Sequence, residues 1–227
     1  MSGYTIQLQL NGRSCVVVGG GAVASRKIKT LLLSSAKIHV VAPVIGPEIT
    51  QWVVEGAVSA ERRPYAGGTD LTGALLVFAA TDSDEVNARV CRDAVEMGLL
   101  ACDSMRPERG SFIVPAALHR GSLVMTVSTS GASPGLAVKL RDELAQRYGD
   151  DYEIYVDFLA ELRTRTHVDI VNPQLRRMIY HHVLTVDILG LIREGRIDAY
   201  RRHVLEVLKR AEDITNWQQE LSPTELT

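Results

Sequence analysis

Two short stretches of the sequence hold residues whose types and spacing could do chemistry. In VVVGGGAVASRK, Gly19, Gly21 and Ala24 give the spacing G-x-G-x-x-A directly after an apolar run. Such glycines allow a tight turn and let backbone amides approach a pyrophosphate, which the dipole of a following helix also attracts. The second stretch, residues 101–116, places Asp103, which can accept or donate a proton, near two arginines and a Gly-Ser pair.

The glycine stretch lies in a regular alternation of apolar runs and helical patterns. Strands are expected at 15–19, 37–43, near Val58, at 74–81 and at 99–103, and helices at 22–35, 46–56 and 83–98. This alternation predicts a mostly parallel sheet with helices on both faces, an α/β fold of the Rossmann type.

The later part of the chain has a different rhythm. Two strands are expected on either side of Arg120-Gly121, followed by a helix with Ser133 as its N-cap and Pro134 at its first position. From Tyr152 to Trp217 the pattern is helical. We therefore expect a dinucleotide-binding domain at 1–110, a small α+β middle unit at 111–150 and a helical C-terminal domain at 151–227.

Two further segments are expected at the carboxyl edge of the sheet. Ala42, Pro43 and Val44 stand where this fold usually has an Asp or Glu for the ribose hydroxyls, so charge does not distinguish NAD from NADP. Thr81 and Asp82 follow a later strand at the same edge and are candidates to contact the cofactor. For Asp82, capping of the next helix is the alternative.

Composition narrows the class of protein. The 25 basic and 27 acidic side chains nearly balance, at net −2, which argues against a nucleic-acid partner. Three widely spaced cysteines indicate neither a disulfide framework nor a zinc site, and no metal site is expected at His119, His181 or His182. No run reaches the ~18 apolar residues of a membrane span, and the N-terminal residues do not read as an export signal. We expect a cytoplasmic protein without a membrane partner.

Several motifs occur together in a specific order. They are GRSCVVVGGGAVASRK, VVAP, AATD with Asn87 in the following helix, SFIVPA and VSTSGASPGLAVKLR. This combination resembles the precorrin-2 dehydrogenase and sirohydrochlorin ferrochelatase family, the N-terminal module of siroheme synthases, over at least residues 5–148. No second large domain follows, so the methyltransferase of the fused enzymes is not expected.

The resemblance implies an activity and a set of binding residues. The activity is NAD-dependent oxidation of precorrin-2 to sirohydrochlorin in siroheme biosynthesis, followed in some members by insertion of ferrous iron as a substrate. The family's cofactor positions fall on Gly19, Gly20, Gly21, Ala22, Val23, Pro43 and Val44. The family's tail also implies a homodimer, for which RMIYHHVLTVDILGLI, residues 177–192, offers apolar surface. The alternative is that this segment packs on its own domain.

The catalytic position departs from the family pattern. The family typically reads Asn-Val-x-Asp-x-Pro before Ser-Phe-Ile, and gapless alignment on Pro107 puts its aspartate at Met105. Asp103 lies two residues earlier, on the same face of an extended chain but about 6–7 Å away, and a bulge would bring it back. We predict Asp103 as the catalytic group. A turn role for Asp103 and a catalytic role for Glu108 stay open.

The substrate is expected to meet hydroxyl and basic side chains. The family's serine-rich loop corresponds to Ser128, Thr129 and Ser130, and Ser111 and Arg141 complete the predicted set. Arg106, Arg109, Arg120 and Lys139 flank the same segments and could bind carboxylates of a polycarboxylate substrate. Cap partners for the hydroxyls and a solvated charged face for the basic groups are the alternatives.

Two other functions remain open at this point. Met105 motivates a tetrapyrrole-binding or chelatase-only protein that does not oxidise its ligand. A nucleotide-sensing regulatory module is the third hypothesis, because a fold of this kind hosts many functions.

Overall fold

The structure, a computed structural model, describes residues 3–223 and divides into two compact units. The first unit runs to Val114 and includes Ser130–Ala132; the second contains Pro115–Thr129 and continues from Ser133. The finer division of the chain at residues 110 and 150 stays a prediction. Residues 1–2 of the predicted N-terminal domain and 224–227 of the predicted C-terminal domain lie outside the described residues.

The first unit is built on a parallel sheet with the order β3-β2-β1-β4-β5. Its strands are β1 (Ser14–Val18), β2 (Lys37–Val41), β3 (Val58–Glu61), β4 (Leu76–Ala79) and β5 (Leu100–Asp103). The chain leaves β1 toward β2 on one side and later returns to β4 on the other. In folds of this kind, ligands bind in a crevice at such a point of reversal, which here is the carboxyl ends of β1 and β4. The predicted α/β fold is confirmed.

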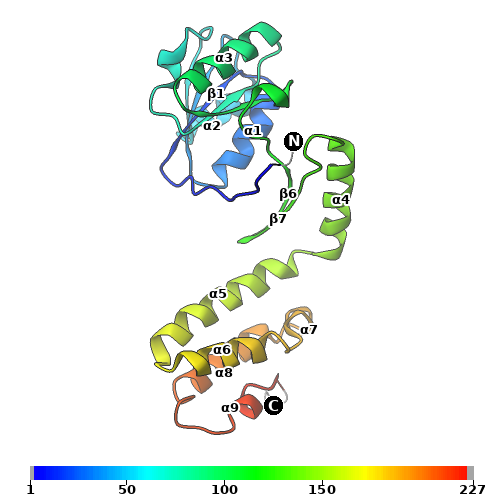
Figure 1. Cartoon of the computed structure of the whole chain (residues 1–227). Helices are drawn as coiled ribbons and strands as arrows, with labels where there is room; N and C mark the ends of the chain where they lie inside the picture. The colour runs from blue at the N-terminus through cyan, green and yellow to red at the C-terminus, as the bar shows by residue number, and fades with distance from the viewer. Residues whose placement is uncertain (1–2, 224–227) are drawn as a thin grey trace. The chain divides into compact units, whose positions relative to one another are not determined.

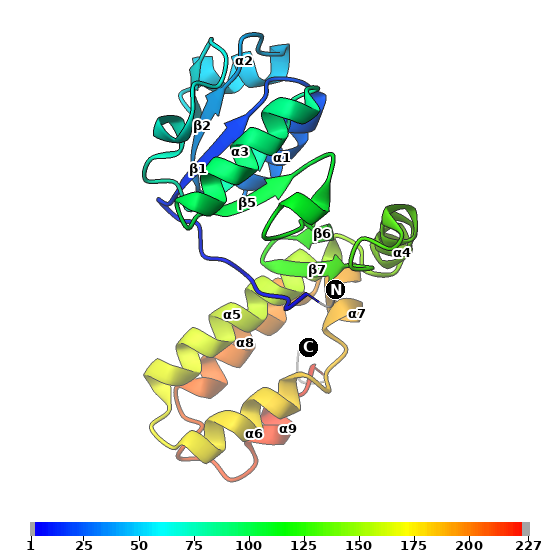
Figure 2. The same cartoon turned by 45° about the horizontal axis from the view of Figure 1, so that its top comes forward.

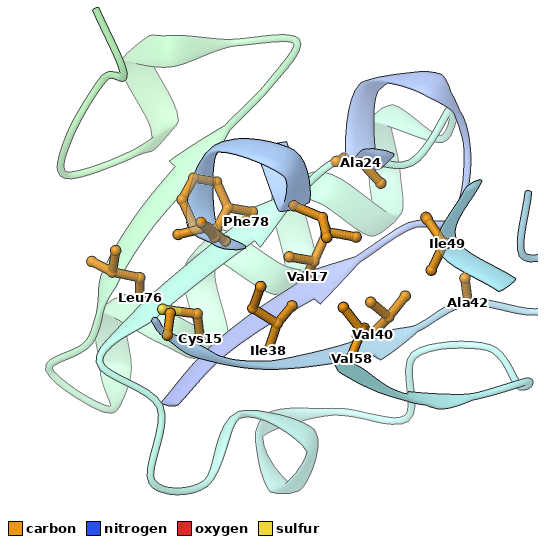
Figure 3. Packing of buried hydrophobic residues seen from close by; sticks show 14 of the residues in the cluster. Cys15, Val17, Ala24, Ile38, Val40, Ala42, Ile49, Val58, Leu76 and Phe78 are labelled. Atoms are coloured by element: carbon orange, nitrogen blue, oxygen red, sulfur yellow. The ribbon is translucent and has the colours of Figure 1, made fainter. Parts of the chain in front are cut away.

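Helices cover both faces of this sheet (Figures 1 and 2). On one face α1 (Ala22–Leu32) and α2 (Pro47–Val54) bury Ile28 and Ile49 against strand residues that include Val17 and Phe78. Figure 3 shows this cluster, with Cys15, Val17, Ile38, Val40, Leu76 and Phe78 along three neighbouring strands. On the other face α3 (Asp84–Glu96) packs on Val16, Val18 and Val77. Strands buried on both faces explain the continuous apolar runs in the sequence.

The second unit begins with a hairpin of β6 (Ala116–Arg120) and β7 (Leu123–Val127). Gly121, at φ +54°, supplies the left-handed conformation that its two-residue turn requires. The two strands lie on either side of Arg120-Gly121, as predicted, and β6 begins only at Ala116 because the amides of Ser111 and Phe112 before it donate to Ala101 O of β5. Helix α4 (Pro134–Arg147) follows with the predicted cap, since Ser133 Oγ accepts from Leu136 N.

The helical tail has a core of its own. Its helices are α5 (Asp151–Asp169), α6 (Pro173–Val183), α7 (Ile188–Arg193), α8 (Ile197–Leu208) and α9 (Trp217–Glu220). From the apolar segment at 177–192, the side chains of Ile179, Val183, Ile188 and Leu191 are buried inside this core. These four residues therefore pack inside their own helical core, which was the alternative to a dimer surface. Among residues 3–223, the helices are too short or too polar to span a bilayer.

Candidate functional site

The glycine loop connects β1 to α1 at the carboxyl end of β1. Gly19 has φ +129°, and a Cβ there would collide with the carbonyl oxygen of Ala80. A Cβ at Gly20 would collide with the carbonyl oxygen of Val44. Both positions therefore require glycine, because the loop is pressed between the segments that follow β4 and β2.

Gly21 differs from the other two glycines. It is the N-cap of α1 at φ −88° and ψ −170°. Among residues 3–223 no side chain caps the helix and, apart from the adjoining residues and the backbone of α1, no atom lies within 4 Å of the place where its Cβ would be. The first amides of a helix lack intrahelical partners, so those of Ala22 and Val23 are available to an anion. By contrast, α3 is capped by Ser83. The loop thus offers an open, uncapped helix start that fits a pyrophosphate.

The segment after β2 is tied to this loop through the main chain. Gly46 N donates to Gly20 O at 2.9 Å, and Gly19 N donates to Val41 O at 3.0 Å. Pro43 is exposed, and the Val44 side chain is 77% exposed beside the loop. The predicted cofactor residues from Gly19 to Val23 and at Pro43 and Val44 therefore lie together at one edge of the first unit.

No carboxylate that could bind the ribose hydroxyls follows directly after β2, as the sequence indicates. The neighbouring strand β3 ends at Glu61, which is paired in register with Val41. The Glu61 carboxylate lies 2.6 Å from Arg63 Nη2 and 3.4 Å from His39 Nε2. This carboxylate is thus already engaged by Arg63 and His39.

Thr81 lies at the same edge and is held by a buried amide. Asn87, with 0% exposure, accepts from Thr81 N at 3.1 Å and Thr81 Oγ1 at 2.8 Å, and its own amide donates to Thr81 O. Sequence reasoning noted Asn87 only as a family sign and missed this positioning role. Asp82 is exposed, and the helix cap proposed as its alternative is supplied by Ser83 instead.

Asp103 ends β5 as a buried carboxylate with 1% exposure. Its Oδ1 accepts from Met105 N at 2.8 Å and Arg106 N at 2.9 Å, so the carboxylate organises the turn out of the strand. Its Oδ2 is buried, has no hydrogen bond to any described residue and lies 3.7 Å from Arg109 Nη1. Met105, at the family's aspartate position, is 53% exposed. The turn role is therefore present in the structure, and the catalytic role stays a prediction.

Two arginines of the same segment converge on the first turn of α3. Arg109 binds Asp84 with two parallel bonds of 2.8 Å, and Arg106 Nε donates to Asp84 Oδ1 at 2.9 Å. The hydrogen bonds from Arg109 and the charge of Arg106 hold the pKa of Asp84 below its usual range. Asp84 was missed in the sequence because an acid in a first helical turn is commonplace. Substrate carboxylates would have to compete with it for these arginines.

The other predicted substrate residues have structural partners too. Ser111 Oγ accepts from Ala101 N at 2.9 Å in the first unit. In the second unit, Thr129 Oγ1 accepts from Ser133 N at 3.0 Å, and Arg141 Nε donates to Asp142 at 2.8 Å. Ser128 and Ser130 flank Thr129, and Ser130 has φ +52°. Their contacts with the substrate stay a prediction.

Two remaining basic candidates are also engaged. Arg120 donates to Tyr148 O at 3.0 Å and thereby caps the end of α4, and Lys139 lies 4.0 Å from Glu143. Across residues 3–223, no group of three His, Cys, Asp or Glu side chains is arranged to hold a metal ion.

The parallel sheet with its reversed strand order and the open glycine loop define a dinucleotide-binding protein of the Rossmann type. The family model described as "Putative NAD(P)-binding" matches residues 6–116, and that described as "Sirohaem biosynthesis protein central" matches residues 120–147.

Proteins similar to this chain include precorrin-2 dehydrogenases and siroheme synthases. The precorrin-2 dehydrogenase of Priestia megaterium is 37% identical over 164 residues, which cover 72% of this chain and 80% of that protein. The siroheme synthase of Nitrosococcus oceani is 32% identical over 191 residues, but the chain spans only 41% of its length. The solved structure of SirC, precorrin-2 dehydrogenase, superposes with a TM-score of 0.74 at 31% identity, over 88% of this chain and 98% of that one. The chain belongs to the precorrin-2 dehydrogenase family, which confirms the resemblance seen in its motifs.

Proposed function

We propose that this protein oxidises precorrin-2 to sirohydrochlorin with NAD. The observation that carries the proposal is the open space at Gly21, where an uncapped helix start faces no side chain in a chain of this family. When bound, the dinucleotide supplies a nicotinamide ring that takes up a hydride from the substrate. The protein itself binds the dinucleotide and takes up the accompanying proton.

The glycine loop does the holding. The amides of Gly21, Ala22 and Val23 would donate to the pyrophosphate, while Pro43 and Val44 would line the ribose and adenine side. Thr81, held rigid by Asn87, would border the opposite side of the crevice. Asp82 would contact the cofactor from the same turn.

Asp103 is proposed to take up the proton. Oδ1 is held by two turn amides, so the buried Oδ2, which has no hydrogen-bond partner, is the basic atom on offer. Since the side chain is buried, the turn through Met105 must open before substrate reaches it. Ser111, Ser128, Thr129, Ser130 and Arg141 are proposed to bind the tetrapyrrole.

A second function is favoured by the same burial. Such a protein would bind the tetrapyrrole, or insert ferrous iron into it, without oxidising it. It would need no accessible aspartate at position 105, where this chain has Met105. Anaerobic absorbance separates the two functions: sirohydrochlorin formed only when NAD is added supports oxidation, and ligand binding without turnover supports the second. The same assay with NADP in place of NAD tests the choice of cofactor, and added ferrous iron tests chelation.

We also propose a homodimer. In α4 only Ala137 is buried, while Leu136 is 45%, Val138 43% and Leu140 37% exposed. Leu136 and Leu140 are four residues apart and share one face of this helix, and a second copy of this chain would cover that face. A location in the cytoplasm is proposed for the enzyme.

A further inference from the structure

A cavity lies between two helices of the tail, within the second unit. Its volume is about 380 Å³, and it is formed by the last turns of α5 and by α6, the two yellow helices of Figures 1 and 2. The lining residues are Arg163, Thr166, His167, Pro173, Arg176, Arg177, Tyr180 and His181. Three arginines and two histidines thus face one cavity that no acidic side chain lines.

The arginines of this cavity lack counter-charges. Within residues 3–223, no carboxylate lies within 4.0 Å of Arg163, Arg176 or Arg177, although Arg165 on α5 is paired with Asp169 at 3.8 Å. The chain as a whole carries net −2, so the cluster does not reflect a generally basic protein. Like charges gathered in one place repel each other, and an anion bound between them would relieve that repulsion.

The helical spacing aims these groups together. Arg163 and His167 are four residues apart on α5, and Arg177 and His181 are four residues apart on α6, so each pair shares a helix face. Arg176 Nη1 donates to His167 Nδ1 at 2.8 Å, which leaves the proton of the neutral ring on Nε2. The imidazole can therefore donate together with the guanidinium groups.

The other polar groups of the lining are occupied. Tyr180 Oη donates to Leu159 O at 2.9 Å, and Thr166 Oγ1 donates to Arg163 O at 3.0 Å. The donors that the lining offers are therefore those of its arginines and histidines, beside apolar surface. Its volume is in the range of small-molecule sites, about 300–1,000 Å³.

We propose that this cavity binds a small multivalent oxyanion, a molecule with neighbouring carboxylate or phosphate groups. Planar guanidinium groups bind both kinds of oxyanion through paired hydrogen bonds. The site lies in the second unit, apart from the glycine loop, and does not depend on the proposed oxidation of precorrin-2.

Calorimetry on the full chain tests the proposal, with citrate as the carboxylate probe and pyrophosphate as the phosphate probe at about 20 mM ionic strength, where charge pairs are little screened. Arg163→Gln combined with Arg177→Gln should weaken binding of the preferred probe at least about tenfold, since each lost charged hydrogen bond is worth about that factor. Arg202→Gln, which removes an exposed arginine of α8 outside the cavity, is the matched control and should stay within about twofold. Ring proton resonances of His167 and His181 should shift on titration.

Equal affinities of the double variant and the Arg202→Gln control would overturn the proposal. So would binding of an oligonucleotide with no binding of either small anion, because that marks a nucleic-acid surface. NAD affinity, measured on the same variants, should be unchanged, which separates failure of this site from failure at the glycine loop. If the double variant does not fold, Arg176→Gln alone carries the test, with the same loss expected.

Discussion

Replacing Gly21 by Asp should change dinucleotide binding and stability in opposite directions. The residue has N-cap geometry, and its Cβ would enter open space, so the side chain fits without moving the chain. Asp is a better N-cap than Gly by a few tenths of a kcal/mol, and a negative charge at a helix start adds about 0.3–1 kcal/mol. The free energy of unfolding should therefore be unchanged or raised by up to about 1 kcal/mol.

Binding should weaken because the new carboxylate occupies the place proposed for a pyrophosphate. Two unit charges 4 Å apart repel by about 4 kcal/mol at an effective dielectric constant of 20, and solvent at the open loop reduces this. We expect a loss of about 1.4–2.8 kcal/mol, or about 10–100-fold in affinity.

Gly21→Asn is the matched control, since it has the same shape and capping ability without the charge. NAD affinity by calorimetry and unfolding in urea would be measured on all three proteins. If Gly21→Asp and Gly21→Asn bind NAD equally well, no anionic group approaches the start of α1, and the site is misassigned.

Three further predictions follow from the site, the tail and the core. Asp103→Asn should retain NAD binding while anaerobic turnover of precorrin-2 falls about 10²–10⁴-fold; turnover at the parent rate would leave Asp103 with its turn role alone. Light scattering at micromolar concentration should give twice the monomer mass, and Leu136→Glu in α4 should lower it; a parent protein that is monomeric at this concentration rules out the dimer. Burial raises the pKa of the Cys15 and Cys91 thiols to about 11, so both should stay protonated and unreactive toward a thiol reagent at pH 8 until urea unfolds the chain. Rapid labelling of either thiol in the folded protein would contradict this account of the core.

The parts of the fold that follow from local signals are those the sequence predicts best. The glycine loop is recognisable because strand, turn and helix each have a pattern in consecutive residues, and the same holds for the cap at Ser133. Asp103 is a different case, because its side-chain direction follows from strand alternation while its burial depends on how the turn through Arg106 folds back. The turn role and the catalytic role of Asp103 cannot be distinguished unless the conformation of that turn is known.

The pairing of Asp84 with Arg109 was missed because the two residues are distant in the sequence. Asp84 and Arg109 are 25 positions apart, and nothing in either neighbourhood announces their pairing. The apolar residues of α6 and α7 illustrate the same limit, because burial within a chain and burial against a second chain require the same apolar pattern. Only the fold shows which partner covers Ile179 and Leu191.

The close approach of Gly20 to the main chain of Val44 fixes the backbone of both loops but leaves the side chain at position 44 free to vary. The two loops are joined through backbone atoms, with Gly46 N on Gly20 O, while the Val44 side chain is 77% exposed and takes no part in that union. Selection, in nature or in the laboratory, can therefore exchange the chemistry presented at position 44 and leave the adjoining turn as it is. A change in the ligands that this fold binds would then come from substitutions at position 44 and not from substitutions of the glycines.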